Sequence, residues 1–124
     1  MALKDLETGK YYKVISVDVF TGYTIIYVYR NEEDRRNSET DPFINKLVIS
    51  ESLPNIRYGA LTVDAITELV DERMKNYKPI PEDATMVTPY DMVPENAVCL
   101  EMIVKYIAYN ELKKLSTYAN LEDA

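Results

Sequence analysis

Two runs rich in tyrosine, valine and isoleucine follow one another early in the chain, separated only by a Thr-Gly pair. The first is KYYKVISVDVF at residues 10–20, and the second is YTIIYVYR at residues 23–30. Such residues favour strands, and a short link that contains glycine favours a tight connection between two antiparallel strands. The sequence therefore predicts a β-hairpin, around which the rest of the fold has to be arranged.

Apolar side chains fall on both faces of this hairpin. Alternation divides the first run into two groups, Tyr11, Lys13, Ile15, Val17 and Val19 on one face and Tyr12, Val14, Ser16, Asp18 and Phe20 on the other. The second run divides into Tyr23, Ile25, Tyr27 and Tyr29 against Thr24, Ile26 and Val28. Neither face is cleanly polar, so we expect both to be covered, one by a helix and the other by a partner subunit.

A polar stretch, NEEDRRNSETDP at residues 31–42, follows the hairpin directly. It lacks the glycine of a calcium-binding loop and shows no catalytic spacing. Asn31 favours a turn, and Glu32 and Arg36 are spaced to pair across one helical turn. Pro42 then favours an extended residue before it. We interpret the stretch as a strand terminator whose charges discourage edge pairing, rather than as an active loop.

The next part of the chain predicts one more strand and a helix. Residues 43–50 are expected to form a third strand, so that residues 1–52 make up a β-rich part. A helix is expected over residues 60–78, because apolar residues recur there at three- and four-residue spacing and Thr62 is suited to cap it. Four of the six prolines fall in residues 79–94, which we expect to be an arm or a functional loop.

Residues 94–117 are expected to form a second helix, with Pro94 in its first turn. The spacing of Glu101 and Lys105 favours a helix, although the alternation in VCLEMIVKYIAY, residues 98–109, also fits a strand. As a helix the segment is apolar around most of its circumference, which is more than we expect one small domain to cover. The predicted fold class is α+β in a single domain: three or four antiparallel strands in the first half, packed with two helices in the second.

Composition excludes several kinds of chemistry. The chain of 124 residues carries a formal net charge of −7 and contains no histidine. An acidic protein repels phosphate backbones, so we expect no nucleic-acid partner. The lack of histidine excludes Ser-His-Asp and Cys-His catalytic arrangements and histidine-based metal sites. The three glycines form neither a P-loop nor a dinucleotide-binding loop, so we expect no cofactor.

Two further features argue against a reactive cysteine and against a signal peptide or a membrane partner. The single cysteine, Cys99, lies in an apolar run, and we interpret it as a small buried hydrophobic residue rather than a reactive thiol. No apolar run has the length of a secretory signal or of a membrane span, so we expect neither a signal peptide nor a membrane partner.

Carboxylates are the remaining side chains that could support catalysis or bind a metal ion. Asp64, Glu68, Asp71 and Glu72 lie within the expected helix at spacings that could place two oxygens on a divalent ion. We favour the alternative that they form the solvated face opposite the apolar stripe, because every amphipathic helix needs one.

Eleven tyrosines, against two phenylalanines and no tryptophan, are the most distinctive feature of the composition. Strand positions favour tyrosine, which explains many of them. Tyrosine also supplies large contact area with a hydrogen-bonding tip, which suits an interface between proteins.

Three stretches resemble small structural proteins encoded by tailed bacteriophages, especially phages of Gram-positive hosts. They are the opening MALKDLETGKYYKVISV, the strand end and turn IIYVYRNEEDRRN, and the C-terminal YIAYNELKKLSTYANLEDA. The resemblance implies a virion or assembly protein of the tail, the baseplate or the head-tail region, and it carries over no functional residue.

We therefore expect a non-enzymatic building block of a larger assembly, a homo-oligomer that contacts itself and other structural proteins. The resemblance implies a place in the virion, with assembly in the host cytoplasm. The candidate interface residues are Tyr27, Tyr29, Leu100, Ile103, Tyr106, Ile107 and Tyr109. Two alternatives remain. One is a small acidic binding or inhibitory module that acts on a host protein through its acidic surface, which includes residues 31–42 and the acidic helix face. The other is an enzyme that uses carboxylates and a metal ion.

Overall fold

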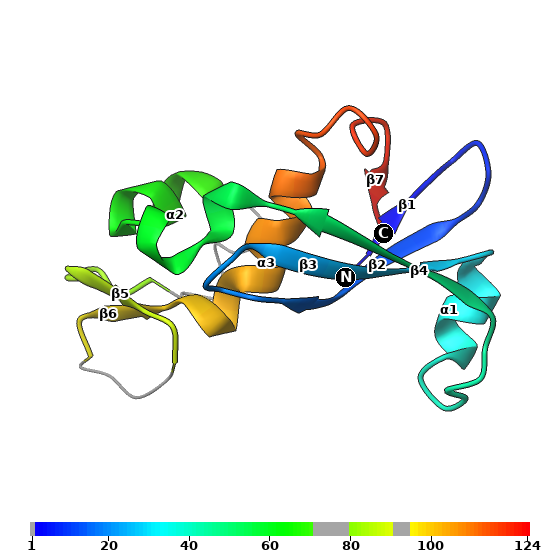
Figure 1. Ribbon diagram of the computed structural model, residues 1–124, viewed down its shortest axis with the longest axis horizontal. Helices are drawn as coiled ribbons and strands as arrows, with labels where there is room; N and C mark the ends of the chain where they lie inside the picture. The colour runs from blue at the N-terminus through cyan, green and yellow to red at the C-terminus, as the bar shows by residue number, and fades with distance from the viewer. Residues whose placement is uncertain (1, 71–79, 91–94) are drawn as a thin grey trace.

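The predicted hairpin is present at the centre of a five-stranded sheet (Figure 1). The computed structural model describes residues 2–70, 80–90 and 95–124. Its elements in chain order are β1 (Leu3–Lys4), β2 (Tyr11–Val17), β3 (Tyr23–Tyr29), α1 (Glu32–Asn37), β4 (Lys46–Ser52), the 3-10 turns η1 (Pro54–Ile56) and η2 (Tyr58–Ala60), α2 (Val63–Leu69), β5 (Met86–Thr88), β6 (Ala97–Cys99), α3 (Leu100–Leu112) and β7 (Glu122–Asp123). The fold is α+β, as predicted.

The sheet has the strand order β4-β3-β2-β1-β7, and every neighbouring pair is antiparallel. β3 pairs with β4 along its whole length, from Tyr23 opposite Ser52 to Tyr29 opposite Lys46. β1 covers only Tyr11 and Tyr12 of β2. The fifth strand, β7, comes from the C-terminal end of the chain, and the sequence analysis did not predict it.

The connection between the two central strands is longer than the predicted Thr-Gly link. β2 ends at Val17, and residues 18–22 form the turn. The Asp18 side chain accepts a hydrogen bond from the Phe20 N–H at 2.9 Å, and the Gly22 N–H donates to the Asp18 carbonyl at 2.7 Å. Because an aspartate side chain that bonds the backbone two residues later stabilises a turn, the chain leaves the strand at Asp18.

A β-bulge in β2 changes the predicted assignment of side chains to faces. The register shifts between Val14 and Ser16, so that Ser16 lies opposite Ile25 and Val17 lies opposite Thr24. An extra residue in one strand reverses the alternation beyond it. Val17 therefore packs against the main core, and its predicted place on the face of Tyr11 is wrong.

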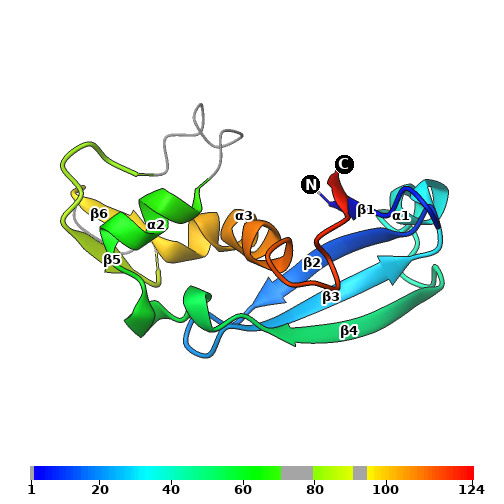
Figure 2. The same ribbon diagram turned by 90° about the horizontal axis from the view of Figure 1, so that it is seen from above.

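The main core lies between one face of the sheet, hereafter the inner face, and the elements of the second half. Val14 and Ile26 from the sheet, Ile56 from η1, Ile66 from α2 and Ile103 from α3 are all buried in it. Figure 2 shows α3 alongside the part of β2 that extends past β1. There the Tyr109 hydroxyl accepts a hydrogen bond from the Val14 N–H at 2.8 Å, which satisfies a backbone donor at the edge of β2.

The segment after α3 also packs on the inner face. The Tyr118 ring meets the Tyr12 ring edge to face, with 5.9 Å between centroids, and its hydroxyl donates to Glu51 Oε1 at 2.6 Å. The chain then forms β7 beside β1, where the Ala124 N–H donates to the Ala2 carbonyl at 3.0 Å. The described parts of both ends of the chain are thus held by the sheet.

Both short helices begin at a capping side chain, which the sequence analysis predicted for Thr62, whereas it gave Asn31 only as a turn residue. The Asn31 side chain accepts from the Asp34 N–H at 2.8 Å at the start of α1, and the predicted pair of Glu32 and Arg36 forms at 2.6 Å. The predicted cap of α2 is confirmed, because the Thr62 hydroxyl accepts from the Ala65 N–H at 3.1 Å. α2 ends at Leu69, and the expected continuation over 71–78 lies outside the described residues.

The expected C-terminal helix over 94–117 is too long at both ends. α3 begins at Leu100, and the three residues before it form β6, which pairs in parallel with β5. The strand alternative, which covered residues 98–109, is thus correct for Val98 and Cys99 alone, and Pro94 lies outside the described residues. β5 falls within the expected arm or loop, where the Tyr58 hydroxyl donates to the Val87 carbonyl at 3.1 Å. Cys99 is buried, as predicted.

Candidate functional site: the open edge and outer face of the sheet

The apolar residues of α3 that were candidates for an interface lie inside the protein. Leu100, Ile103 and Ile107 are fully buried, and Tyr109 is 3% exposed. The sheet, η1, α2 and the segment after α3 together cover them. The expectation that one small domain cannot cover both sides of this helix is therefore wrong. These four side chains are part of the core.

The other three candidates differ in exposure. Tyr106 is half-buried and packs against the main core. Tyr29 is 3% exposed and forms a small second cluster with Ala2 and Tyr11. Tyr27 is half-buried and lies on the face of the sheet that points away from the main core, hereafter the outer face. Of the candidates, Tyr27 is the one placed on a partly open part of the sheet.

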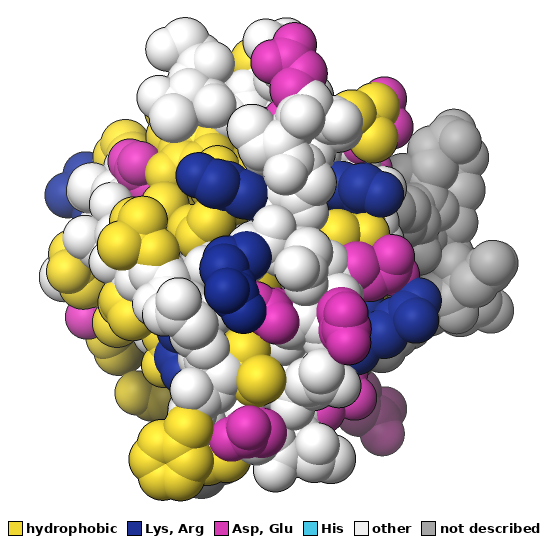
Figure 3. All heavy atoms as spheres, turned by 90° about the vertical axis from the view of Figure 1, so that its right-hand side faces the viewer, with side chains coloured by type: hydrophobic (Ala, Val, Ile, Leu, Met, Phe, Trp, Pro, Cys, Tyr) yellow, Lys and Arg dark blue, Asp and Glu magenta, His cyan; other side chains and the backbone are white. Residues whose placement is uncertain are grey.

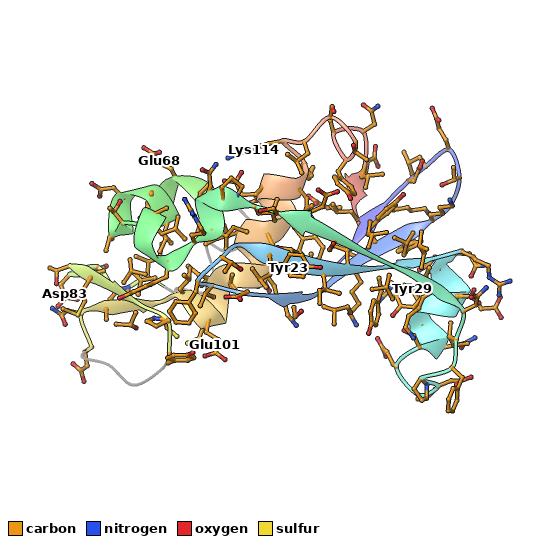
Figure 4. The ribbon with its side chains drawn as sticks, viewed as in Figure 1. Tyr23, Tyr29, Glu68, Asp83, Glu101 and Lys114 are labelled. Carbon is orange, nitrogen blue, oxygen red and sulfur yellow. The ribbon has the colours of Figure 1, made fainter. Side chains whose placement is uncertain are left out.

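The outer face is covered at one end and open beside it. At the covered end, α1 packs near Tyr11, where the Arg35 guanidinium carbon lies 5.6 Å from the ring centroid (Figure 1). Tyr23 at the other end of β3 is 51% exposed, and Figure 4 shows it well separated from Tyr29. Tyr27 lies between them, with Lys13 opposite on β2 and Val48 opposite on β4.

The open edge of the sheet is β4. It pairs with β3 on one side, and no strand among the described residues pairs with its other side. Two large apolar residues in it are exposed, Leu47 by 62% and Val48 by 58%, and Phe43 just before it is 92% exposed. An unpaired strand with exposed apolar residues is a template for pairing with another chain.

The direction of the backbone groups along β4 follows from one hydrogen bond. The Leu53 N–H donates to the Gly22 carbonyl at 2.9 Å, so Leu53 faces β3. Because backbone groups alternate in direction along a strand, those of Leu47, Ile49 and Glu51 also face β3. The open edge therefore presents the N–H and C=O groups of every second residue, which are Lys46, Val48, Ser50 and Ser52.

Cations lie close to the tyrosines at this end of the sheet. Lys46 Nζ is 5.0 Å from the centroid of the Tyr27 ring and donates a hydrogen bond to the Pro42 carbonyl at 3.2 Å. Figure 3, which views the end that carries α1, shows hydrophobic side chains gathered on the side where β4 lies, with Lys and Arg beside them. An apolar patch with a charged rim is typical of a protein-protein contact surface.

The acidic face of α2 shows no metal site in the part that is described. Asp64 and Glu68 are exposed, whereas Asp71 and Glu72 lie outside the described residues. No group of three or more Cys, Asp or Glu side chains that could hold a metal ion is found among residues 2–70, 80–90 and 95–124. In the same residues, no helix is long and apolar enough to cross a membrane.

Sequence reasoning did not single out Leu47, Val48 or Phe43. The strand predicted over residues 43–50 contains all three, whereas β4 begins only at Lys46 and ends at Ser52. Its place at the edge depends on strand order, which alternation does not reveal. One signal was available: LVIS puts three consecutive apolar residues in a strand, so that both of its faces carry apolar side chains.

No protein-family model matches the chain, and no curated protein or solved structure is significantly similar to it.

Proposed function

We propose that this protein is a non-enzymatic structural subunit that self-associates through β4. Two copies would pair their β4 strands antiparallel about a two-fold axis and so continue the sheet from one copy into the other. The observation that carries the proposal is the seven-residue open edge with Leu47 and Val48 exposed. A two-fold contact uses the same patch on both copies, so one self-complementary strand is enough.

The apolar residues of β4 suggest a register for this pairing. With the axis at Val48, the two Val48 side chains lie opposite each other on the outer face. Leu47 of each copy then lies opposite Ile49 of the other on the inner face. The outward backbone groups of Lys46 and Ser50 also meet in this register, as antiparallel hydrogen bonding requires. Placing the axis at Ile49 instead would put Leu47 against Glu51, a less favourable pair.

The resemblance of three sequence stretches to phage structural proteins supports a virion as the setting of this subunit. Tyr23 and Tyr27 on the outer face remain available for other structural proteins when β4 is paired. The absence of histidine from the whole sequence supports the non-enzymatic part of the proposal.

Light scattering coupled to size exclusion tests the proposal. We expect the unmodified protein to form a dimer, and Val48→Lys to be monomeric, because two ammonium groups would face each other at the axis. Met102→Lys is the matched control: Met102 is 50% exposed on α3, away from β4, and the same change there should leave the dimer intact. A monomer at all concentrations up to about 0.5 mM would contradict the proposal.

A second variant separates strand pairing from other apolar contacts. Ser50→Pro removes an N–H that faces the open edge and leaves the bonds to β3, so an edge strand should tolerate it. The variant should fold and be monomeric.

Hydrogen exchange gives the complementary readout: the amides of Val48 and Ser50 should exchange slowly in the dimer and rapidly in Val48→Lys. Rapid exchange of both amides in a stable dimer would place the contact elsewhere.

A further inference from the structure

Glu111 on α3 is a buried carboxylate with weak partners. Its side chain is 5% exposed, yet the donors near it among the described residues are distant: Asn55 Nδ2 lies 3.4 Å from Oε1, and Lys114 Nζ lies 3.4 Å from Oε1 and from Oε2. Charge-assisted hydrogen bonds are usually about 2.7–2.9 Å long. The other buried acid, Asp34, has such a bond, at 2.7 Å from Arg30 Nε. Glu111 thus has acceptor capacity that these two donors leave largely unused.

Two hollows meet at this carboxylate. One, of about 270 Å³, lies between α2 and the end of α3 and is lined by Asn55, Glu111 and Lys114 together with Leu61, Leu69 and Glu68. The other, of about 180 Å³, shares the first three residues and is otherwise lined by Leu53, Pro54 and Leu115. The smaller hollow is therefore mainly apolar beside Glu111, whereas the larger one has a mixed polar and apolar lining. Figure 4 shows Glu68 and Lys114 on the same side of the molecule, at the rim of the larger hollow.

We propose that Asn55 and Glu111 form a socket for an arginine side chain presented by an extended segment of a partner protein, and that the Lys114 ammonium occupies this socket until the arginine binds. The guanidinium would donate two hydrogen bonds to the two oxygens of Glu111, and apolar residues beside the arginine would occupy the hollows. The side chain of Lys114 is 60% exposed, so it can swing into solvent when the guanidinium enters.

The geometry favours a guanidinium over other cations. The two oxygens of a carboxylate match a planar donor fork, which an ammonium group cannot provide, and Lys114 Nζ, 3.4 Å from both oxygens of Glu111, marks where such a fork would lie. A divalent ion would need several oxygen ligands, and in the described residues Glu111 belongs to no cluster of three acidic or cysteine side chains. The net charge of −7 attracts cationic segments to the protein as a whole.

Nuclear magnetic resonance titration with three probes tests the proposal. N-acetyl-arginine methylamide should shift the Asn55 side-chain amide signals saturably, with a dissociation constant of about 1–10 mM for two charge-assisted hydrogen bonds. The citrulline analogue has the same shape without the charge and should cause no saturable shift. Acetyl-Leu-Arg-Leu-amide should bind about tenfold more tightly, because its leucines would enter the hollows. Equal affinity for the two arginine probes would overturn the assignment to a protein segment.

Two variants tie the binding to the socket. Glu111→Gln keeps the shape of the side chain and should weaken arginine binding at least tenfold, whereas Glu101→Gln, an exposed position on the same helix, should not change it. Lys114→Gln removes the competing ammonium and should tighten binding severalfold, which provides a test even if Glu111→Gln does not fold. Unchanged or weaker binding by Lys114→Gln would overturn the proposal. All titrations are made in the Val48→Lys background, so that their outcome does not depend on self-association.

Discussion

Gly22 occupies a position that no other residue type fits. Its φ is +77°, and a Cβ atom there would collide with the carbonyl of Leu53. Gly9 also has a positive φ, of +76°, but a Cβ atom would meet nothing, and Gly59 has neither restriction. Comparing the three glycines therefore distinguishes the cost of a left-handed backbone from the cost of a steric collision.

We predict that alanine substitution destabilises the protein most at Gly22, less at Gly9 and least at Gly59. Gly22→Ala should lower the free energy of unfolding by about 2–4 kcal/mol, because it combines a left-handed conformation with a collision. Gly9→Ala should cost about 1 kcal/mol, and Gly59→Ala should stay within about 0.5 kcal/mol of the unmodified protein. Urea unfolding measures all three. Equal costs at Gly9 and Gly22 would show that the approach of Leu53 is not limiting.

Tyr118 makes stability sensitive to alkaline pH. Burial, the hydrogen bond to the Glu51 carboxylate and the charge of that carboxylate all raise the pKa of Tyr118 above its ordinary value of 10.0. The folded state therefore holds the phenol proton more tightly than the unfolded state does. The resulting stabilisation is complete below pH 10 and is lost as the pH rises from there toward the raised pKa.

We predict that the free energy of unfolding falls above pH 10 and that the fall is shallower in Tyr118→Phe. The phenylalanine variant should be less stable than the unmodified protein at pH 7, because the bond to Glu51 is gone. Tyr23→Phe, at an exposed position, is the control and should leave the profile unchanged. Chemical unfolding at a series of pH values checks this. An identical slope in Tyr118→Phe would mean that other groups cause the alkaline loss.

Among the elements, α1 is short enough to depend strongly on its cap. It has six residues, and the Asn31 side chain satisfies the N–H of Asp34 at its start. Asn31→Ala should destabilise the protein by about 1 kcal/mol, whereas Asn31→Ser keeps a capping oxygen and should cost less. Hydrogen exchange of the Asp34 amide should accelerate in the alanine variant alone. Equal exchange in both variants would show that the cap does not hold this turn.

The sequence predicted the elements whose signal is local. The strands β2 and β3, the cap at Thr62, the turn at Asn31 and the pair of Glu32 and Arg36 each depend on residues within a few positions of one another, which explains why they could be predicted. The bulge between Val14 and Ser16 could not be predicted from the sequence, because inserting one residue leaves the composition of a strand unchanged.

The candidate site was mostly misplaced, for a reason of packing. The apolar circumference of α3 suggested an exposed surface, but the sheet and the segment that carries Tyr118 together cover it. That segment comes last in the chain and has little apolar periodicity, so its folding back onto the sheet could not be predicted. No pattern in the sequence indicated that Glu111 is buried, because its burial results from the packing of η1 and α2 around the end of α3.

For the molecule as a whole, the net charge of −7 should act in opposite directions on the two proposed contacts. Two copies repel each other, so raising salt from about 0.05 to 0.5 M should tighten the β4 dimer severalfold, because the screening length shortens. The same change should weaken arginine binding at Glu111. Sedimentation and resonance titration at both salt concentrations measure the two effects. A change of the same sign in both would refute this electrostatic account.

The short strands at the far side of the sheet limit how far growth through β4 can proceed. Once two copies pair, the outermost strand of each is the two-residue β7, which is too short to recruit another strand. In the proposed pair, each subunit would use the one long open edge of its five-stranded sheet, and a ten-stranded sheet would be the end point. A larger assembly would have to be built from closed pairs joined through other surfaces, which makes the pair its repeating unit.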